Sequence, residues 1–462
     1  MTAETFVRYP RYRRPSYSHR SDFAGSSSAP LLARFTAFAI FFFPSSMVIS
    51  PLGAVGTVSI MLSCLLFVLW LASWLWGLHD PIPLRHPGRL AGAVFALGIM
   101  ASYISLYGGW VGEGSVAGLA AADRWVVLVI ASLGLILCVG DALKTRDQVL
   151  SIVRWLIAGG FFSSLVGLVQ FTLHVNPMEW IQAAMPGFTY NGGDDAYQAR
   201  GNLVRVSGST FHAIEFAVTS AMLLPLSMWR SMFDPRGLRW LHWVQTLLFG
   251  AVVIMTVSRS GVLGVAVALA VSLPFMPRLV RRWTIVIAPI LVVTAFAIVP
   301  GFVGTITTAL TANASDPSIA NRVNNFPRVE MMIDHRPLFG TGPGTYDTRN
   351  LVNVLDNQYL TSAVTTGIIG LVCVAFYLLL PGVLAIVAAR HTTDPNTKSL
   401  AGALAGGLAA AGVCSIAFDS LSFPVFALTY PLMVALAGVV WKICKAESRM
   451  LGLHPVPLER GK

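Results

Sequence analysis

The stretch QYLTSAVTTGIIGLVCVAFYLLLPGVLAI, residues 358–386, contains no charged side chain. A run of about 20 apolar residues is long enough to cross the hydrocarbon core of a bilayer as a helix. The rest of the chain has the same character, because 55% of its 462 residues are hydrophobic and only 11% are charged. A soluble domain carries about 25% charged residues. The chain is therefore expected to be an all-α, polytopic membrane protein, and a single soluble core is excluded.

Apolar runs near this length recur along the sequence and predict about twelve transmembrane helices. The first run is interrupted by Pro44, and only the turn Ser258–Ser260 separates the seventh from the eighth. The predicted spans are 34–50, 54–77, 90–107, 124–141, 152–172, 211–229, 242–257, 260–276, 284–303, 358–386, 399–418 and 423–441.

Lysine and arginine set the expected orientation, because cytoplasmic connections of membrane proteins carry an excess of both. Placing the N-terminus inside makes every even-numbered connection basic. We therefore expect a multi-pass protein of the cytoplasmic (inner) membrane with both termini cytoplasmic. Its parts would be a disordered basic tail over 1–33, a membrane domain over 34–441 and a second tail over 442–462. The formal charge of +11 then reflects topology, so no nucleic-acid partner is expected.

Two long connections fall on the predicted outer side, 173–210 and 304–357. The positive charge predicted outside is arginine alone, whose planar fork binds phosphate oxygens in pairs. The alternative is chance, since the chain has only five lysines against 27 arginines. The outer arginines are Arg124, Arg200, Arg205, Arg259, Arg322, Arg328, Arg336 and Arg349.

Arg259 and a polar group beginning at Arg205 are the first candidate site residues. Arg259 lies in TVSRSG, between two apolar runs, where an ionisable group usually lines a cavity; the alternative is an arginine that snorkels to the lipid headgroups. The stretch RVSGSTFHAIEF leads into a span and offers Arg205, His212 and Glu215. His212 could equally cap or anchor the helix. Glu215 lies about one turn inside the apolar run, so we expect it to face protein or water.

The outer connection 304–357 contains a short predicted helix and a glycine-rich turn. Pro327 suits the first turn of a helix, Val329, Met332 and Ile333 would form its apolar face, and Pro337 would end it. Gly340, Gly342 and Gly344 follow in HRPLFGTGPGTY, where they permit a tight turn and a close backbone approach to a ligand. The chain has no D-x-D, H-E-x-x-H or G-x-S-x-G motif, so we expect neither a metal nor another cofactor.

The order of these elements resembles the O-antigen ligase/polymerase superfamily, the O-antigen ligase-like integral membrane proteins. The resemblance is carried by RVSGSTFHAIEFA, TVSRSG, NRVNNFPRVEMMIDHRPLFGTGPGTY and DNQYLTSAVTTGIIGL. It implies a GT-C-like fold of about twelve helices, with a large extracytoplasmic loop before a late helix. It also implies glycosyl transfer from a polyprenyl-diphosphate-linked glycan to a glycan or lipid acceptor, among membrane lipids, without a metal.

The resemblance also assigns roles to residues. Without a metal, arginines must stabilise the diphosphate that leaves, and the motifs give Arg205, Arg259 and Arg322 this role. Members of the family tend to carry a histidine before the Asn of N-x-Y-L, but this chain has Asp356 there, which could accept the proton of the acceptor. The alternative for Asp356 is a helix N-cap, and His212 and Glu215 are the fallback bases. The remaining substrate-binding candidates are Arg328, the three glycines, Asn357 and Tyr359.

A transporter or flippase for lipid-linked saccharides is the alternative function. Such a protein should carry charge through the depth of the bilayer and an inverted repeat. The predicted spans are almost free of charge and the polar candidates collect at the outer side, so the sequence favours the transferase. It leaves open whether the enzyme is a ligase or a polymerase.

Overall fold

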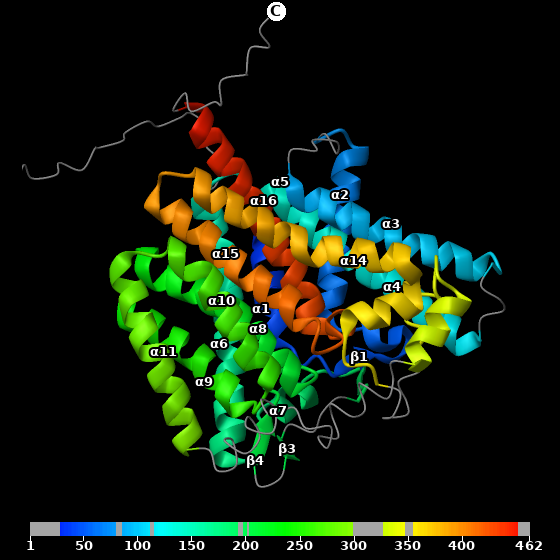
Figure 1. Ribbon diagram of the computed structural model, residues 1–462, viewed down its shortest axis with the longest axis horizontal. Helices are drawn as coiled ribbons and strands as arrows, with labels where there is room; N and C mark the ends of the chain where they lie inside the picture. Colours follow the sequence, from blue (N-terminus) through cyan, green and yellow to red (C-terminus); the bar gives the residue numbers. More distant parts are fainter. Residues whose placement is uncertain are drawn as a thin grey trace, which may run out of the picture.

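A computed structural model describes residues 28–79, 86–110, 115–192, 197–200, 203–298, 327–346 and 354–450. Figure 1 shows that α-helices dominate this part of the chain. The helices are α1 (Leu31–Phe42), α2 (Val58–Leu75), α3 (Pro87–Tyr107), α4 (Val116–Gly134), α5 (Gly140–Ala142), α6 (Arg146–Leu173), α7 (Met178–Ala183), α8 (Ala213–Phe233), α9 (Arg239–Met255), α10 (Arg259–Ser272), α11 (Arg278–Ile298), α14 (Gln358–His391), α15 (Pro395–Cys414) and α16 (Pro424–Met450).

Short elements complete the fold. The π-helical turn η2 (Leu135–Val139) joins α4 to α5, and the 3-10 turns are η1 (Ser50–Val55), η3 (Leu273–Phe275) and η5 (Ser420–Ser422). Two antiparallel pairs of strands are present: β1 (Met47–Ile49) with β2 (Phe188–Tyr190), and β3 (Tyr197–Arg200) with β4 (Leu203–Val206). In the first pair Met47 lies opposite Tyr190, and in the second Tyr197 lies opposite Val206.

The structure confirms the all-α, polytopic class. Within the described residues, seven helices are long and apolar enough to cross a membrane, and three shorter helices are also apolar. A helix overlaps each of the twelve predicted ranges, while the number of true spans remains a prediction. The first range needs a correction: α1 begins at Leu31 and ends at Phe42, because Pro44 cannot continue a helix. A turn and then β1 follow within 34–50.

The helices α15 and α16 form the centre of the bundle. In the apolar 18-residue stretch of each helix, 83% of the residues of α15 and 89% of those of α16 are buried, compared with 22% in α2. The reason for the burial of α15 is its composition, since LAGALAGGLAAAG lets neighbouring backbones approach closely. It packs against α14, α10 and α8.

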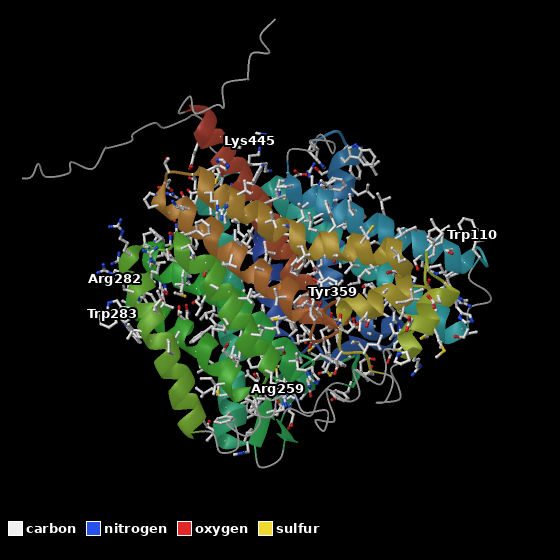
Figure 2. All side chains as sticks on the ribbon, viewed as in Figure 1. Trp110, Arg259, Arg282, Trp283, Tyr359 and Lys445 are labelled. Carbon is white, nitrogen blue, oxygen red and sulfur yellow. The ribbon has the colours of Figure 1, made fainter. Side chains whose placement is uncertain are left out.

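The basic connections, predicted to be cytoplasmic, contact one another at one end of the bundle. The Arg146 guanidinium lies 2.7 Å from the Asp394 carboxylate, although the two turns are 248 residues apart in the chain. Lys442 donates a hydrogen bond to the carbonyl of Gly140 at 2.8 Å. In Figure 2, Lys445 lies near the top and Arg282 at the left edge, whereas Arg259 lies low in the molecule and Trp110 at the right edge.

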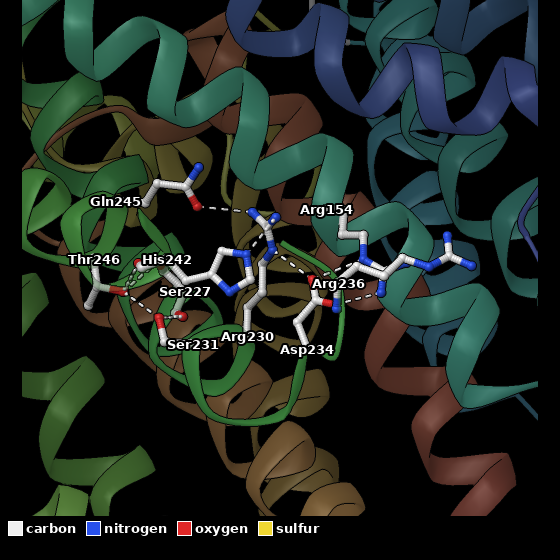
Figure 3. Close-up of polar contacts among 9 residues, drawn as sticks. All are labelled: Arg154, Ser227, Arg230, Ser231, Asp234, Arg236, His242, Gln245 and Thr246. Carbon is white, nitrogen blue, oxygen red and sulfur yellow. Dashed lines mark hydrogen bonds and ion pairs between the residues drawn. The ribbon is translucent and has the colours of Figure 1, made fainter. Parts of the chain in front are cut away.

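A buried ion cluster ties α6, α8 and α9 together at the basic end (Figure 3). Asp234, at the end of α8, accepts hydrogen bonds from Arg154 Nε at 2.9 Å and from Arg230 Nε at 3.1 Å. Arg230 also donates to Gln245 on α9 at 3.0 Å. Burial alone would raise the pKa of Asp234, but the hydrogen bonds from Arg154, the Arg236 backbone and Arg230 outweigh it and lower this pKa to about 2. The carboxylate is therefore charged at neutral pH and holds the arginines in place.

Candidate functional site

Arg205 and the TVSRSG motif meet at the end opposite the ion cluster. Arg205, on β4, donates from Nε to the carbonyl of Thr256 at 3.2 Å, which is the residue after α9. Val257 follows with φ of +49°, a left-handed conformation that is strained for a β-branched side chain. Ser258 then caps α10, and half-buried Arg259 is the first residue of that helix. The turn thus places Arg259 at a helix N-terminus, beside Arg205, where both contribute positive potential.

His212 is the N-cap of α8. Its Nδ1 accepts a hydrogen bond from the backbone nitrogen of Ile214 at 3.0 Å, so in the neutral ring the proton is on Nε2. Burial and then the charge of Arg205 lower the pKa of His212 to about 4, while Asp356 opposes the shift. His212 is therefore neutral near pH 7 and its Nε2–H can donate a hydrogen bond, while its role as a fallback base remains a prediction. These interactions also show that Arg205 and Asp356 lie near the same ring.

Glu215 has a structural environment. It is fully buried, and one carboxylate oxygen accepts from the backbone nitrogens of Val425 at 2.6 Å and Phe426 at 3.0 Å. The other oxygen accepts from the nitrogen of Phe211 at 2.9 Å. Glu215 therefore caps the start of α16 as well as its own helix. Contact with substrate remains a prediction for this residue, and these hydrogen bonds do not favour it.

Asp356 lies immediately before α14 but is not its N-cap. The cap is Asn357, whose side-chain oxygen accepts from the nitrogens of Tyr359 at 2.9 Å and Leu360 at 3.2 Å. Asp356 itself has φ of +45°, and such left-handed positions in non-glycine residues concentrate at functional sites. The sequence leaves open that Asp356 is the helix N-cap, and in the structure its neighbour Asn357 has that role.

The start of α14 is fastened to the end of α15. The backbone nitrogen of Gln358 donates to the carbonyl of Ser415 at 2.9 Å, and its side-chain oxygen accepts from the nitrogen of Leu421 at 2.7 Å. The hydroxyl of Tyr359 donates to the carbonyl of Gly412 at 2.8 Å. Tyr359 therefore anchors the helix, and the connection 415–423 is fixed beside Asp356.

That connection brings in Asp419, a residue that the sequence analysis missed. One of its oxygens accepts from the Ser422 hydroxyl at 2.5 Å, and the other is buried with no hydrogen-bond partner among the residues that the structure describes. Burial and the charge of Asp356 raise the pKa of Asp419 to about 6, although the hydrogen bond from Ser422 opposes the shift. The signal was available, because Asp419 is a charged residue in a short turn between apolar runs, as is Arg259.

The predicted outer helix is present over residues 327–335. Val329 is buried in an apolar cluster with Leu355 and Val364, which fits the predicted apolar face. Arg328 lies with its guanidinium 5.8 Å from the centre of the Tyr346 ring, a cation–π arrangement. An open pocket of about 290 Å³ adjoins this helix. Its lining residues are Arg328, Met331, Met332, His335, Arg336 and Thr341.

The glycine turn makes its close backbone approach to the protein itself. The helix α14 is broken at Gly367, which has φ of +66°. The nitrogen of Gly342 donates to the carbonyl of Thr365 at 2.8 Å, and that of Ile368 donates to the carbonyl of Pro337 at 2.8 Å. The turn therefore satisfies backbone groups that the break leaves open. Contact of Gly340, Gly342 or Gly344 with a ligand remains a prediction, as does the role of Arg322, which lies outside the described residues.

A comparison with known families adds to this geometry. Residues 245–375 match the family model described as O-antigen ligase. This segment is similar to the O-antigen ligase family. The O-antigen ligase segment contains Arg259, Arg328, the glycine turn and Asp356, whereas Arg205, His212 and Asp419 lie outside it. No curated protein matches the chain. The superfamily resemblance is confirmed, and with the apolar helices it indicates a membrane protein of the O-antigen ligase/polymerase type.

Proposed function

We propose that the protein is a glycosyltransferase that moves a glycan from a polyprenyl diphosphate to an acceptor on the outer face of the cytoplasmic membrane. The observation that carries the proposal is the meeting of Arg205, His212 and Asp356, from three separate segments, beside the turn of Arg259. Phosphate-binding cations and a possible base thus share one end of the bundle. Transfer from a lipid-borne diphosphate would use the cations to stabilise the leaving group and the base to take the acceptor's proton.

The reaction forms a bond between the acceptor oxygen and the anomeric carbon and breaks the bond from that carbon to the diphosphate. Arg205, Arg259 and Arg322 stabilise the negative charge that the lipid diphosphate gains. Arginine forks bind phosphate oxygens in pairs, so this scheme needs no metal ion. The neutral His212 donates from Nε2, either to the acceptor or to the phosphate.

Two carboxyl groups compete for the role of base that takes the acceptor's proton. Asp356 occupies the position at which the resemblance places a histidine. Asp419 has the raised pKa, about 6, and a general base works best when its pKa is near the working pH. The negative charge of Asp356 contributes to the raised pKa of Asp419.

The test is transfer by purified protein in lipid nanodiscs, with lipid-linked glycan extracted from the producing strain. Arg259→Ala should abolish transfer without changing expression, and Arg259→Lys should restore little, because a single ammonium cannot reproduce the fork. Activity should persist in EDTA. Wild-type activity of Arg259→Lys, or loss in EDTA that magnesium or manganese restores, would contradict the proposal.

Glycan analysis of a deletion strain separates the two branches of the superfamily. Loss of long chains with normal attachment indicates a polymerase. Loss of attachment with lipid-linked chains accumulating indicates a ligase. Accumulation of unflipped lipid-linked units on the inner leaflet would indicate a flippase and overturn the transferase proposal.

A further inference from the structure

The exposed carboxylate of Asp123 lies among aromatic side chains at the predicted outer ends of α3 and α4, apart from the residues discussed above. The hydroxyls of Tyr103 and Tyr107 both donate to the same oxygen of Asp123, at 2.9 Å and 2.8 Å. The two rings lie 4.7 Å apart, centre to centre. This contact fixes the carboxylate, and its second oxygen accepts no hydrogen bond from the part of the chain that the structure describes.

Trp110 extends this surface toward the glycine turn. Its side chain is 71% exposed and that of Tyr107 is 50% exposed, which is high for rings of this size. The Trp110 ring lies 6.2 Å from the ring of Phe339, which belongs to the glycine turn. Figure 2 shows Trp110 at the right-hand edge of the molecule, well separated from Arg259. The surface is therefore distinct from the arginine site and adjoins the glycine turn.

The carboxylate is the feature that interfacial anchoring alone leaves unexplained. Exposed tryptophan and tyrosine are common at the membrane surface, where they anchor helices. Placing an acidic residue near the apolar region of the membrane costs free energy, and an aromatic anchor does not require one. A rigid acceptor oxygen beside exposed ring faces instead suits a sugar, which offers hydroxyl donors at its edge and a C–H face for stacking.

We propose that Asp123, Tyr103, Tyr107 and Trp110 form a binding subsite for a neutral sugar of the glycan chain. This inference rests on the proposed function, because the subsite would hold a part of the donor glycan that lies away from the reacting sugar. Asp123 accepts hydrogen bonds from sugar hydroxyls, and Trp110 and Tyr107 stack on the ring. A uronic acid is disfavoured at this place, since the carboxylate would repel it.

The experiment measures binding without turnover, so it is independent of the transferase proposal. The probe is the saccharide released by mild acid from the lipid carrier of the producing strain, titrated by calorimetry into protein in nanodiscs. Trp110→Ala and Asp123→Asn should each weaken binding by about tenfold, a change of about 1.4 kcal/mol. Trp76→Ala is the matched control, since Trp76 is 75% exposed at the other end of the bundle and should bind as wild type.

A second readout separates sugar binding from anchoring. In the transfer assay, Trp110→Ala should raise the KM for long-chain donors with little change in kcat, and should leave donors of one repeat unit unaffected. Wild-type binding by both variants would overturn the inference while leaving the proposed function intact. Equal loss of thermal stability in Trp110→Ala and Asp123→Asn, with unchanged saccharide affinity, would show that the cluster is only a membrane anchor.

Discussion

Gly340 and Gly367 approach each other so closely that a side chain fits on neither. A Cβ atom on Gly340 would lie 2.6 Å from the backbone nitrogen of Gly367, and one on Gly367 would lie 2.3 Å from the carbonyl oxygen of Leu338. Both residues have positive φ, +67° and +66°. The turn of the outer connection is therefore seated in the break of α14, and a broken helix is tolerated at membrane depth only where its free backbone groups find such partners.

Gly340→Ala should destabilise the protein even without substrate. The added methyl group would clash with the backbone of α14, and the left-handed φ adds strain for alanine. We expect a fall of several degrees in the melting temperature of detergent-purified protein, with loss of transfer. Gly250→Ala is the control, because a Cβ there meets nothing within 4 Å; it should leave stability equal or higher, since alanine favours helix.

The same pair of variants tests the interpretation that these glycines contact a ligand. Under that interpretation Gly340→Ala would melt as the wild type does and would lose only donor affinity. A normal melting temperature combined with a raised KM would therefore return Gly340 to the substrate-binding residues.

Asp356→Asn and Asp419→Asn should separate the two candidate bases. Each change keeps the size of the side chain and removes its ability to take a proton. Loss of a general base lowers the rate by about 10²-fold or more, so the residue that acts as base should show this fall in kcat. The pH–rate profile gives a second measurement: if Asp419 is the base, activity should decline as the pH falls through about 6, the raised pKa of its carboxyl.

Asn357 supplies the control for this comparison. Asn357→Asp retains an N-cap oxygen and should be nearly as stable as wild type, whereas Asn357→Ala should cost about 1 kcal/mol of stability. Asn357→Ala, which adds no charge, should leave the pH–rate profile unchanged, whereas the new carboxylate of Asn357→Asp lies next to Asp356 and should move the decline in activity to higher pH. Wild-type kcat in both Asp356→Asn and Asp419→Asn would remove the carboxylates from the mechanism.

Periodicity and composition predict most of this fold. The bilayer thickness fixes the helix length, and every backbone polar group in the membrane needs a hydrogen-bond partner, so an apolar chain has few alternatives. They place a helix at each of the twelve ranges and the short helix after Pro327. They cannot show that Glu215 caps α16, since its partners Val425 and Phe426 are 210 and 211 residues away in the chain. They also leave the role of the glycines open, because a close approach to a ligand and one to a distant helix require the same residue type.

Asp234→Asn should weaken the bundle in a pH-dependent way. The pKa of Asp234 is about 2 in the folded protein, below the usual 3.8. The charged Asp234 therefore contributes its full stabilisation of the folded protein at a pH above the pKa of this residue in the unfolded chain. This contribution is lost as the pH falls from about 4 toward 2. The variant should melt lower than wild type at pH 7, because Arg154 and Arg230 would stay buried without a counter-charge. The difference should shrink at the lowest pH, and Asp334→Asn, an exposed carboxylate, should melt as wild type at every pH.

Cysteine labelling in intact cells tests the orientation on which the outer site depends. Thr393 is exposed in the connection between α14 and α15, which the basic residues place inside, and Glu179 is exposed on α7, which they place outside. Cysteines introduced at these two positions, with the five native cysteines replaced by alanine, should differ in their reaction with a membrane-impermeant maleimide. Glu179→Cys should label in intact cells, and Thr393→Cys should label only after the membrane is opened. The reverse pattern would place Arg259, Asp356 and Asp419 on the cytoplasmic side, where the outer-leaflet reaction could not occur. Labelling of both positions in intact cells would instead show that an even number of helices crosses the membrane between Glu179 and Thr393. One of the predicted spans between them would then not cross the membrane.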